Sequence, residues 1–169
     1  MAIEQPAYRV LLKEAAYEVR QYDPLILAVS QEEDLRGYSG FGNVFDYIQG
    51  NNAQHQKIAM TAPVINELSD RAMTTAFVMP KTLGMTDLPQ PTSQRLALQE
   101  KPARMVAVLR FSGNVKPAVI AEKARLLQAW ITQHGYLPVG SNEVARYNPP
   151  FIPGVLKRNE VWLEVLPPQ

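Results

Sequence analysis

Tyr47–Asn52 reads YIQGNN and Lys57–Val64 reads KIAMTAPV, and this pair of strings decides the fold of the chain. Neither hydrophobic periodicity nor turn chemistry alone demands so particular a sequence. Two further blocks of the same character flank the pair. They are YEVR at Tyr17–Arg20 and ARYNPP at Ala145–Pro150, and the second leads to KRNEVW at Lys157–Trp162. Together the blocks span nearly the whole chain, so we read them as one signature.

Composition limits the function before any motif is read. The length of 169 residues suits one domain that can bury its own core. A hydrophobic fraction of 46% and a charged fraction of 20% are typical of a folded, soluble protein. The net charge of +1 creates no broad field that attracts phosphate backbones, so we expect no nucleic-acid partner. The absence of cysteine excludes disulfides, thiolate catalysis, Fe–S clusters and Cys-bound zinc.

The sequence predicts neither a secretory signal nor a membrane-spanning segment. Met1–Pro6 has neither a basic region nor an apolar region of the kind that a secretory signal needs. The longest nearly uncharged apolar run, Leu25–Ser30, is far shorter than the roughly 20 residues that cross a bilayer. We therefore expect a cytoplasmic protein without a membrane partner.

The first half of the chain predicts two strands, a helix and two strands. Tyr17–Tyr22 alternates large and polar side chains, and Leu25–Gln31 resumes as a more apolar strand after Asp23-Pro24. Lys57–Asn66 and Thr74–Met79 are β-branched and aromatic enough to form two more strands. These segments enclose the predicted helix.

The predicted helix has one apolar face. Its members occur at positions i, i+3, i+4 and i+7: Phe41, Val44, Phe45 and Ile48. Ser39 is suited to cap the start of the helix and Gly50 to end it. A helix with four large residues at this spacing either packs in the core or lines a pocket, and the pattern alone leaves both open.

The second half repeats this order after a Pro- and Gly-containing connection at Thr82–Ser93. Its predicted elements are the strands Leu96–Glu100 and Met105–Leu109, a helix from Pro117 to Gly135, and the strands Glu143–Tyr147 and Glu160–Leu166. The predicted helix has one apolar stripe, formed by Ile120, Ala124, Leu127 and Ile131. A shift of about 79 positions lays the first half on the second. We predict one α+β domain over residues 1–169, built as a pseudo-two-fold pair of repeats at about 8–80 and 94–167.

These blocks resemble the SOUL haem-binding protein family, over roughly Pro6–Val165. The resemblance implies a duplicated unit in which about eight antiparallel strands form a curved sheet or distorted barrel with two packed helices, as in GyrI-like effector-binding domains. It also implies that haem is held non-covalently against the first helix, by apolar contacts and by basic groups near the propionates. On this reading the protein is a carrier or buffer of a tetrapyrrole, and not an enzyme.

Carried onto this chain, the resemblance places the haem on the apolar helix face. The methionine of the signature, Met60, is a candidate neighbour of the ring, because thioether sulfur can ligate iron; core packing is the simpler reading of Met60 and of Met79. The two histidines lack a partner at metal spacing. His55 lies in a polar turn where it is expected to be exposed, and His134 is placed to cap the second helix.

The basic part of the family pattern is poorly matched. The positions that are basic in haem-binding vertebrate members fall here on Tyr38, Asp46 and Ile152. Four other basic residues are near in sequence and are candidates to replace them: Arg36, Lys57, Lys157 and Arg158. Whether they approach the same face is a question of structure.

A second reading follows the GyrI-like resemblance. Glu160 and Glu164 share a strand face with Trp162 by period two, and on that reading Glu160 holds another small amphipathic or cationic ligand between the repeats, or acts as a general base. The alternative is a sheet-edge carboxylate paired with Lys157 or Arg158. The third reading is an enzyme that acts on a small molecule, for example a hydrolase, through the same acid and a tyrosine. The chain contains no HExxH, Walker loop or Ser-centred elbow that would favour it.

The candidate binding residues from both readings are Arg36, Tyr38, Phe41, Val44, Phe45, Ile48, Lys57, Met60, Glu160 and Trp162. No residue is assigned a catalytic or metal-binding role.

Overall fold

The computed structural model describes residues 3–32, 39–69, 72–148 and 152–169. Over these residues the chain forms nine strands, two α-helices and one 3₁₀ turn. In chain order they are β1 (Tyr8–Glu14), β2 (Tyr17–Tyr22), β3 (Leu25–Glu32), α1 (Ser39–Ile48), β4 (Val64–Leu68), β5 (Met73–Val78), β6 (Leu96–Lys101), β7 (Arg104–Phe111), α2 (Pro117–Gln133), β8 (Leu137–Arg146), η1 (Gly154–Leu156) and β9 (Asn159–Leu166). None of the helices in the described ranges is long and apolar enough to cross a membrane.

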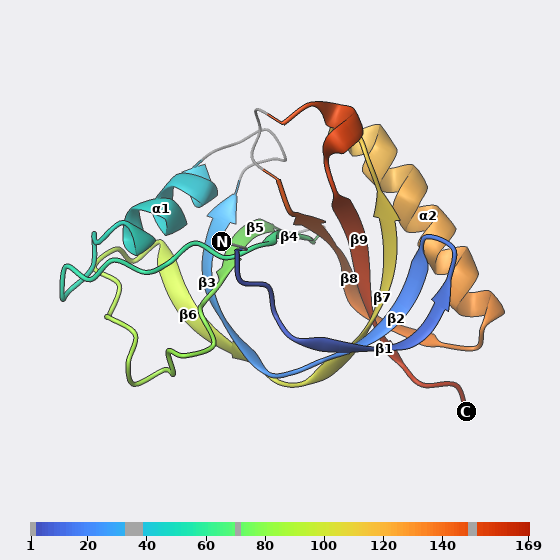
Figure 1. Ribbon diagram of the computed structural model, residues 1–169, viewed down its shortest axis with the longest axis horizontal. Helices are drawn as coiled ribbons and strands as arrows, with labels where there is room; N and C mark the ends of the chain where they lie inside the picture. The colour runs from blue at the N-terminus through green and yellow to red at the C-terminus, as the bar shows by residue number, and fades with distance from the viewer. Residues whose placement is uncertain (1–2, 33–38, 70–71, 149–151) are drawn as a thin grey trace.

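All nine strands belong to one antiparallel sheet in the order β1-β2-β7-β9-β8-β4-β5-β3-β6. The sheet is open and strongly curved, with β1 and β6 at its edges (Figure 1). The first two strands of each predicted repeat do not pair with each other, because β2 pairs with β7 and β3 with β6. Without β1, the order reads the same when the two predicted repeats are exchanged. That order is compatible with a duplication, which stays a prediction.

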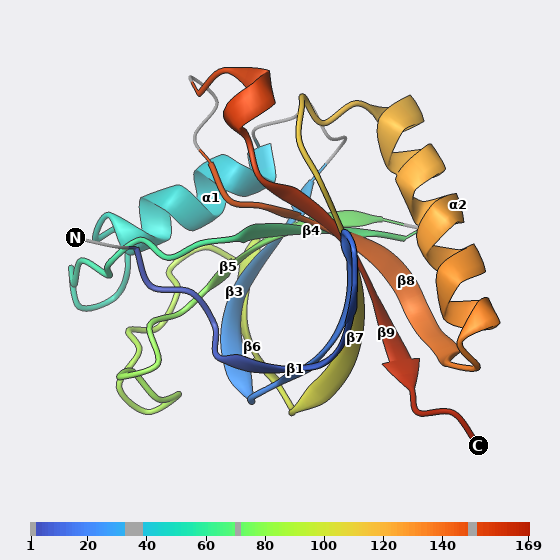
Figure 2. The same cartoon turned by 45° about the vertical axis from the view of Figure 1, so that its right-hand side comes forward.

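The two faces of the sheet have different cores. Both helices pack on the outer, convex face, where α1 contacts β3 and β5 while α2 contacts β7, β8 and β9 (Figures 1 and 2). The stripe predicted for α2 is buried there, with Ile120, Leu127 and Ile131 at 3% exposure or less. The concave face carries its own cluster, in which Tyr22, Val106 and Trp162 meet from separate strands. Because both helices pack on the convex face, the core of the concave face is formed by side chains of the strands.

One predicted strand is largely wrong. Lys57–Asn66 was expected to be a single strand, but only the part from Val64 onward joins the sheet. Before that point the backbone finds other partners: Ile58 donates its N–H to the carbonyl of Ile48 on α1, at 2.8 Å, and Ala62 donates to the carbonyl of Glu4, at 3.0 Å. The signature segment therefore ties the helix and the N-terminal segment together instead of extending β4.

Two strands differ from the prediction for a common reason, which is an irregularity in register. β1 was not predicted, since a bulge between Val10 and Leu12 breaks the alternation that identifies a strand. β8 begins at Leu137 instead of Glu143, because a second irregularity between Val139 and Glu143 interrupts its pairing with β9. The predicted eight strands are thus nine.

Candidate ligand-binding site

The apolar face of α1 divides into a buried half and an outer half. Val44 and Ile48 are 0% and 1% exposed and belong to the cluster that contains Phe77 and Met79. Val44 and Ile48 therefore pack in the core, and their side chains are not accessible at the surface of α1. Met79 is buried as predicted.

The outer half is an aromatic pair on one flank of α1. The rings of Phe41 and Phe45 are stacked with centroids 5.9 Å apart, and Phe41 also contacts Phe77 at 5.3 Å. Phe41 is half-buried, whereas Phe45 is 38% exposed. We group these two rings with Met60, which is exposed on the segment that the Ile58–Ile48 hydrogen bond ties to the end of α1, and call the three side chains the aromatic flank. A large exposed apolar side chain that is held in place by a buried neighbour is the kind of group that binds flat apolar ligands.

The position of Met60 corrects the expectation that it packs in the core. Ile58 and Ala62 are buried at 5% and 8% exposure, but Met60 between them is 39% exposed. The segment is not a strand at this point, so the alternation that would put Met60 on the face of Ile58 and Ala62 does not hold, and the Met60 side chain lies at the surface. Its sulfur is accessible to a ligand.

The start of α1 is fixed to β3. Glu32 accepts a hydrogen bond from the Phe41 N–H at 3.0 Å and another from the Ser39 hydroxyl at 2.9 Å. The carboxylate of Glu32 thus serves the free N–H groups of the helix, the role predicted for Ser39. Gly40 allows this close approach, because a Cβ at that position would lie 2.5 Å from the Gln31 carbonyl oxygen. The aromatic flank therefore stands on a helix with a defined position.

The basic candidates fall into different places. Lys57 is exposed and lies beside Gly50, at the end of α1. Lys157 donates to Asn114 at 3.3 Å, and Arg158 pairs with Glu160 at 3.0 Å. Arg36 and Tyr38 lie outside the described residues. Asp46 is exposed, and Ile152 is half-buried. Lys57 is therefore a basic candidate that lies at the end of α1.

The histidines match their simpler readings. His55 is exposed in the turn after α1, with a left-handed backbone at φ 51°. The ring of His134 lies between the Trp130 carbonyl at 2.8 Å and the Glu14 carboxylate at 3.2 Å, where it caps α2. Within the described ranges, no three His, Cys, Asp or Glu side chains are grouped as a metal site requires. The aromatic flank thus offers apolar contact but no evident iron ligand apart from a thioether.

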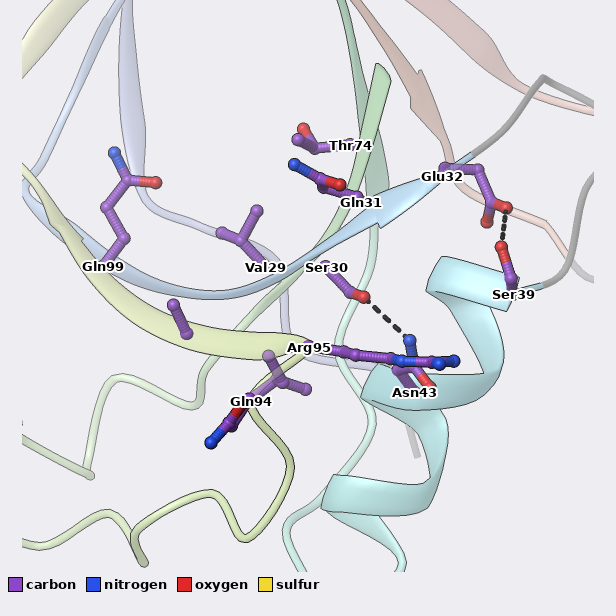
Figure 3. A pocket seen from close by; sticks show the side chains of 12 residues that line it. Val29, Ser30, Gln31, Glu32, Ser39, Asn43, Thr74, Gln94, Arg95 and Gln99 are labelled. Atoms are coloured by element: carbon purple, nitrogen blue, oxygen red, sulfur yellow. Dashed lines mark hydrogen bonds between the residues drawn. The ribbon is translucent and has the colours of Figure 1, made fainter. Parts of the chain in front are cut away.

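The opposite flank of α1 borders a cavity of about 710 Å³ at the end of β3 and β6 (Figure 3). Its lining is rich in amides and hydroxyls: Ser30, Gln31, Ser39, Asn43, Thr74, Gln94 and Gln99, together with Arg95. Some of these groups bond one another, as Asn43 does with Ser30 at 3.0 Å. Val29, Leu96 and Ala97 complete the lining, so the cavity offers a mixed polar and apolar surface.

The concave face holds the second candidate, Glu160, in a saturated site. Oε1 accepts from Arg20 at 2.8 Å, from Tyr147 at 2.9 Å and from Trp162 at 2.8 Å. Oε2 accepts from Arg20 at 2.9 Å and from Arg158 at 3.0 and 3.2 Å. Three donors on each oxygen exceed the four lone-pair positions of a carboxylate. Glu160 is 0% exposed and has no capacity left for a ligand.

The electrostatics of Glu160 follow from its partner. Burial alone raises the pKa of the Glu160 carboxyl, but the hydrogen bonds and charge of Arg20 outweigh burial and lower that pKa to about 2. Burial raises the pKa of the Tyr147 hydroxyl well above its ordinary value, and the Glu160 charge adds to that effect. Near neutral pH the group is therefore an ion pair with a neutral tyrosine, and Glu160 is not poised as a general base.

The predicted setting of Glu160 was partly right. It shares a face with Trp162, and it pairs with Arg158, as expected. It does not lie at a sheet edge, because β9 runs between β7 and β8 in the interior of the sheet. Its main partner, Arg20, was not predicted. The available signal was the alternation of Tyr17–Tyr22, which places Arg20 on the same face as Tyr22.

The architecture first defines a class. An open, curved antiparallel sheet with two helices on its convex face is the fold of GyrI-like domains. The EcmrR C-terminal domain matches with a TM-score of 0.69 at 12% identity, over 94% of this chain and 98% of that one. A hydrolase from Listeria innocua matches with a TM-score of 0.60 at 11% identity, over 92% and 94%. At these identities the likeness shows the fold alone.

The sequence then identifies the family. The family model described as SOUL heme-binding protein matches residues 3–164. Heme-binding protein 2 of Homo sapiens is 28% identical over 162 residues, covering 88% of this chain and 77% of the relative. Heme-binding protein 2 of Mus musculus is 27% identical over 181 aligned residues, covering 96% and 86%. The chain belongs to the SOUL heme-binding protein family, as its signature blocks predicted.

Proposed function

We propose that this protein binds haem or a related tetrapyrrole without covalent attachment, as a carrier or buffer that catalyses no reaction. Two lines of support meet here, namely membership of the family and the aromatic flank of α1. The observation that carries the proposal is the outer ring of the stacked pair, Phe45, which is 38% exposed beside a helix whose inner face is already filled.

The residues fit a tetrapyrrole in part. A bound tetrapyrrole would supply a flat apolar ring and propionate carboxylates. Phe45 and Phe41 offer apolar contact to such a ring, Met60 offers a thioether, and Lys57 offers a positive charge near the end of α1. The exposed position of these side chains implies a shallow site in which apolar contact dominates.

The alternative ligand, an amphipathic or cationic molecule held by Glu160, has weaker support. A cation needs a carboxylate that is free to approach, and both oxygens of Glu160 are already occupied by donors from Arg20 and Arg158. The same saturation weakens the reading of Glu160 as a base in a hydrolase. The concave face is considered again below for that reason.

A hemin titration followed by the Soret band tests the proposal. We expect a saturable one-to-one shift for the unmodified protein and a loss of at least tenfold in affinity for Phe45→Asp, because the charge must be desolvated against the ring. Circular dichroism establishes that the variant is folded. Leu137→Asp is the matched control, since Leu137 is 45% exposed on β8, away from α1.

The outcomes separate cleanly. Loss of the shift in Phe45→Asp, with Leu137→Asp unchanged, supports a site on the aromatic flank. A non-saturable signal, or equal behaviour of the two variants, overturns it. Met60→Leu adds a further distinction: a changed Soret position with retained affinity indicates thioether ligation, whereas an unchanged spectrum indicates apolar contact alone.

A further inference from the structure

We propose that the concave face is a cation-binding cage of the aromatic and carboxylate type, and that the guanidinium of Arg20 occupies it permanently as an internal ligand. This inference is independent of the haem proposal, since it concerns the other face of the sheet. It explains why a face with the chemistry of a ligand site shows no capacity for one.

The first observation is the enclosure of the guanidinium. Arg20 is 2% exposed, although its side chain is charged. Its Cζ lies 4.3 Å from the centroid of the Tyr8 ring, a cation–π contact. The Tyr22 hydroxyl accepts from Nη1 at 2.9 Å, and Glu18 accepts from Nε at 2.7 Å. A ring, a phenol and carboxylates thus surround one planar cation.

The second observation is the organisation of the cage floor. The Glu160 carboxylate binds the guanidinium through two parallel hydrogen bonds, of 2.8 and 2.9 Å. Its remaining capacity is filled by Tyr147 and Trp162 on Oε1 and by Arg158 on Oε2, which fix its orientation. The Tyr22 ring also contacts the Trp162 ring, with centroids 5.0 Å apart. Trp162 on β9 and Tyr147 directly after β8 therefore orient the carboxylate, and Tyr22 on β2 packs against Trp162.

The third observation is that the roof comes from a separate segment. Tyr8 stands at the start of the edge strand β1, and its ring contacts Tyr22 at 5.0 Å. The segment before it is fastened on both sides, because Glu4 accepts from Ala62 and Ala7 accepts from the Asp23 N–H at 3.1 Å. The N-terminal segment thus closes the cage over the guanidinium.

The second buried ion pair of the concave face provides a contrast. Arg104 binds Glu143 through hydrogen bonds of 2.8 and 3.0 Å, and lies 3.5 Å from Glu164. Among the described residues, the guanidinium groups that lie over an aromatic ring are those of Arg20 and Arg158. Arg104 is thus an ion pair at the same face without the roof, which makes it a natural control.

Chemical rescue tests the proposal. Arg20→Ala deletes the side chain beyond Cβ, and ethylguanidinium contains the deleted atoms. We expect ethylguanidinium, well below denaturing concentrations, to raise the Tm of Arg20→Ala saturably, by about 3–5 °C at ten times its Kd. Ethylurea has the same shape without the charge and should leave the Tm unchanged. The unmodified protein should respond to neither compound, because its cage is full.

Two further variants define the result. Arg20→Ala/Glu160→Gln lacks the carboxylate and should lose the response, and Arg104→Ala should show at most a weak one. Should Arg20→Ala be unfolded alone, the readout becomes recovery of native circular dichroism, which ethylguanidinium must produce and ethylurea must not. Equal effects of the two compounds, an equal response of Arg104→Ala, or no effect of ethylguanidinium would each overturn the proposal.

Discussion

The concave face and the aromatic flank of α1 differ in whether their side chains are already satisfied by neighbouring residues or are left exposed to solvent. On the concave face, Glu160 and Arg20 are 0% and 2% exposed, and each donor and acceptor between them is matched. On the flank, Phe45 and Met60 are 38% and 39% exposed and leave apolar surface to solvent. The concave face has the richer chemistry and the flank has the free capacity. A ligand needs side chains that are still free to contact it, so the proposed site lies on the flank.

The largest expected effect comes from removing the negative charge of Glu160 on the concave face. Glu160→Gln keeps the shape of the side chain but removes the buried carboxylate that pairs with Arg20, so that Glu18 is left as the carboxylate partner of the guanidinium. We expect a loss of about 3–5 kcal/mol in the free energy of unfolding, measured by urea denaturation.

Glu122→Gln is the control for that experiment. Glu122 forms an exposed pair with Arg125 on α2, and we expect its loss to leave the free energy of unfolding nearly unchanged. Similar losses in the two variants would show that the concave pair is no more than a surface salt bridge.

Acid should break the ion pair between Glu160 and Arg20 in the unmodified protein. The Glu160 pKa is about 2 in the folded chain against an ordinary value of 4.5, so its contribution is fully present above pH 4.5 and is lost as the pH falls toward 2. The difference corresponds to about 3 kcal/mol. Urea midpoints measured between pH 6 and pH 2 should fall, and the fall should be smaller in Glu160→Gln. Parallel profiles would assign the acid sensitivity to other carboxylates.

The position of α1 can be tested with two glycines of one helix. Gly40→Ala places a Cβ 2.5 Å from the Gln31 carbonyl oxygen, so the helix must shift, and we expect a loss of about 1–3 kcal/mol. Gly42→Ala meets nothing within 4 Å and should stabilise the protein by about 0.5–1 kcal/mol. Because α1 carries the aromatic flank, Gly40→Ala should also weaken hemin binding while Gly42→Ala does not. Identical stability changes would contradict the close approach of α1 to β3.

Elements with a local sequence pattern were predicted, and elements whose partners are distant or irregular were not. The period-two pattern of Tyr17–Tyr22 and the stripe of α2 were enough to predict those elements, because each pattern is local. The fold class followed from the blocks and from the order of elements. β1 was missed because a bulge at Leu11 removes the alternation, and Lys57–Thr61 was misread because its partners are a helix end and the N-terminal segment.

The candidate site was predictable only in part for a similar reason. The spacing predicted that Phe41, Val44, Phe45 and Ile48 share one apolar face of the helix. It could not predict which part of that face is buried, because this depends on packing against Phe77 and Met79. The partner of Glu160 lies 140 residues away in sequence. Charge pairing over that separation depends on the exchange of strands between the repeats, with β2 beside β7, and no local pattern carries it.

The smallest expected effect separates stability from binding on α1 itself. Phe45→Ala removes an exposed ring and its stacking on Phe41, and should cost about 1 kcal/mol or less in unfolding free energy. Val44→Ala removes two buried methyl groups one residue away and should cost about 2–3 kcal/mol. Hemin affinity should follow the opposite order, with the larger loss in Phe45→Ala. If hemin affinity instead falls in proportion to stability in the two variants, Phe45 acts only as a packing residue, and the flank is not a separate binding surface.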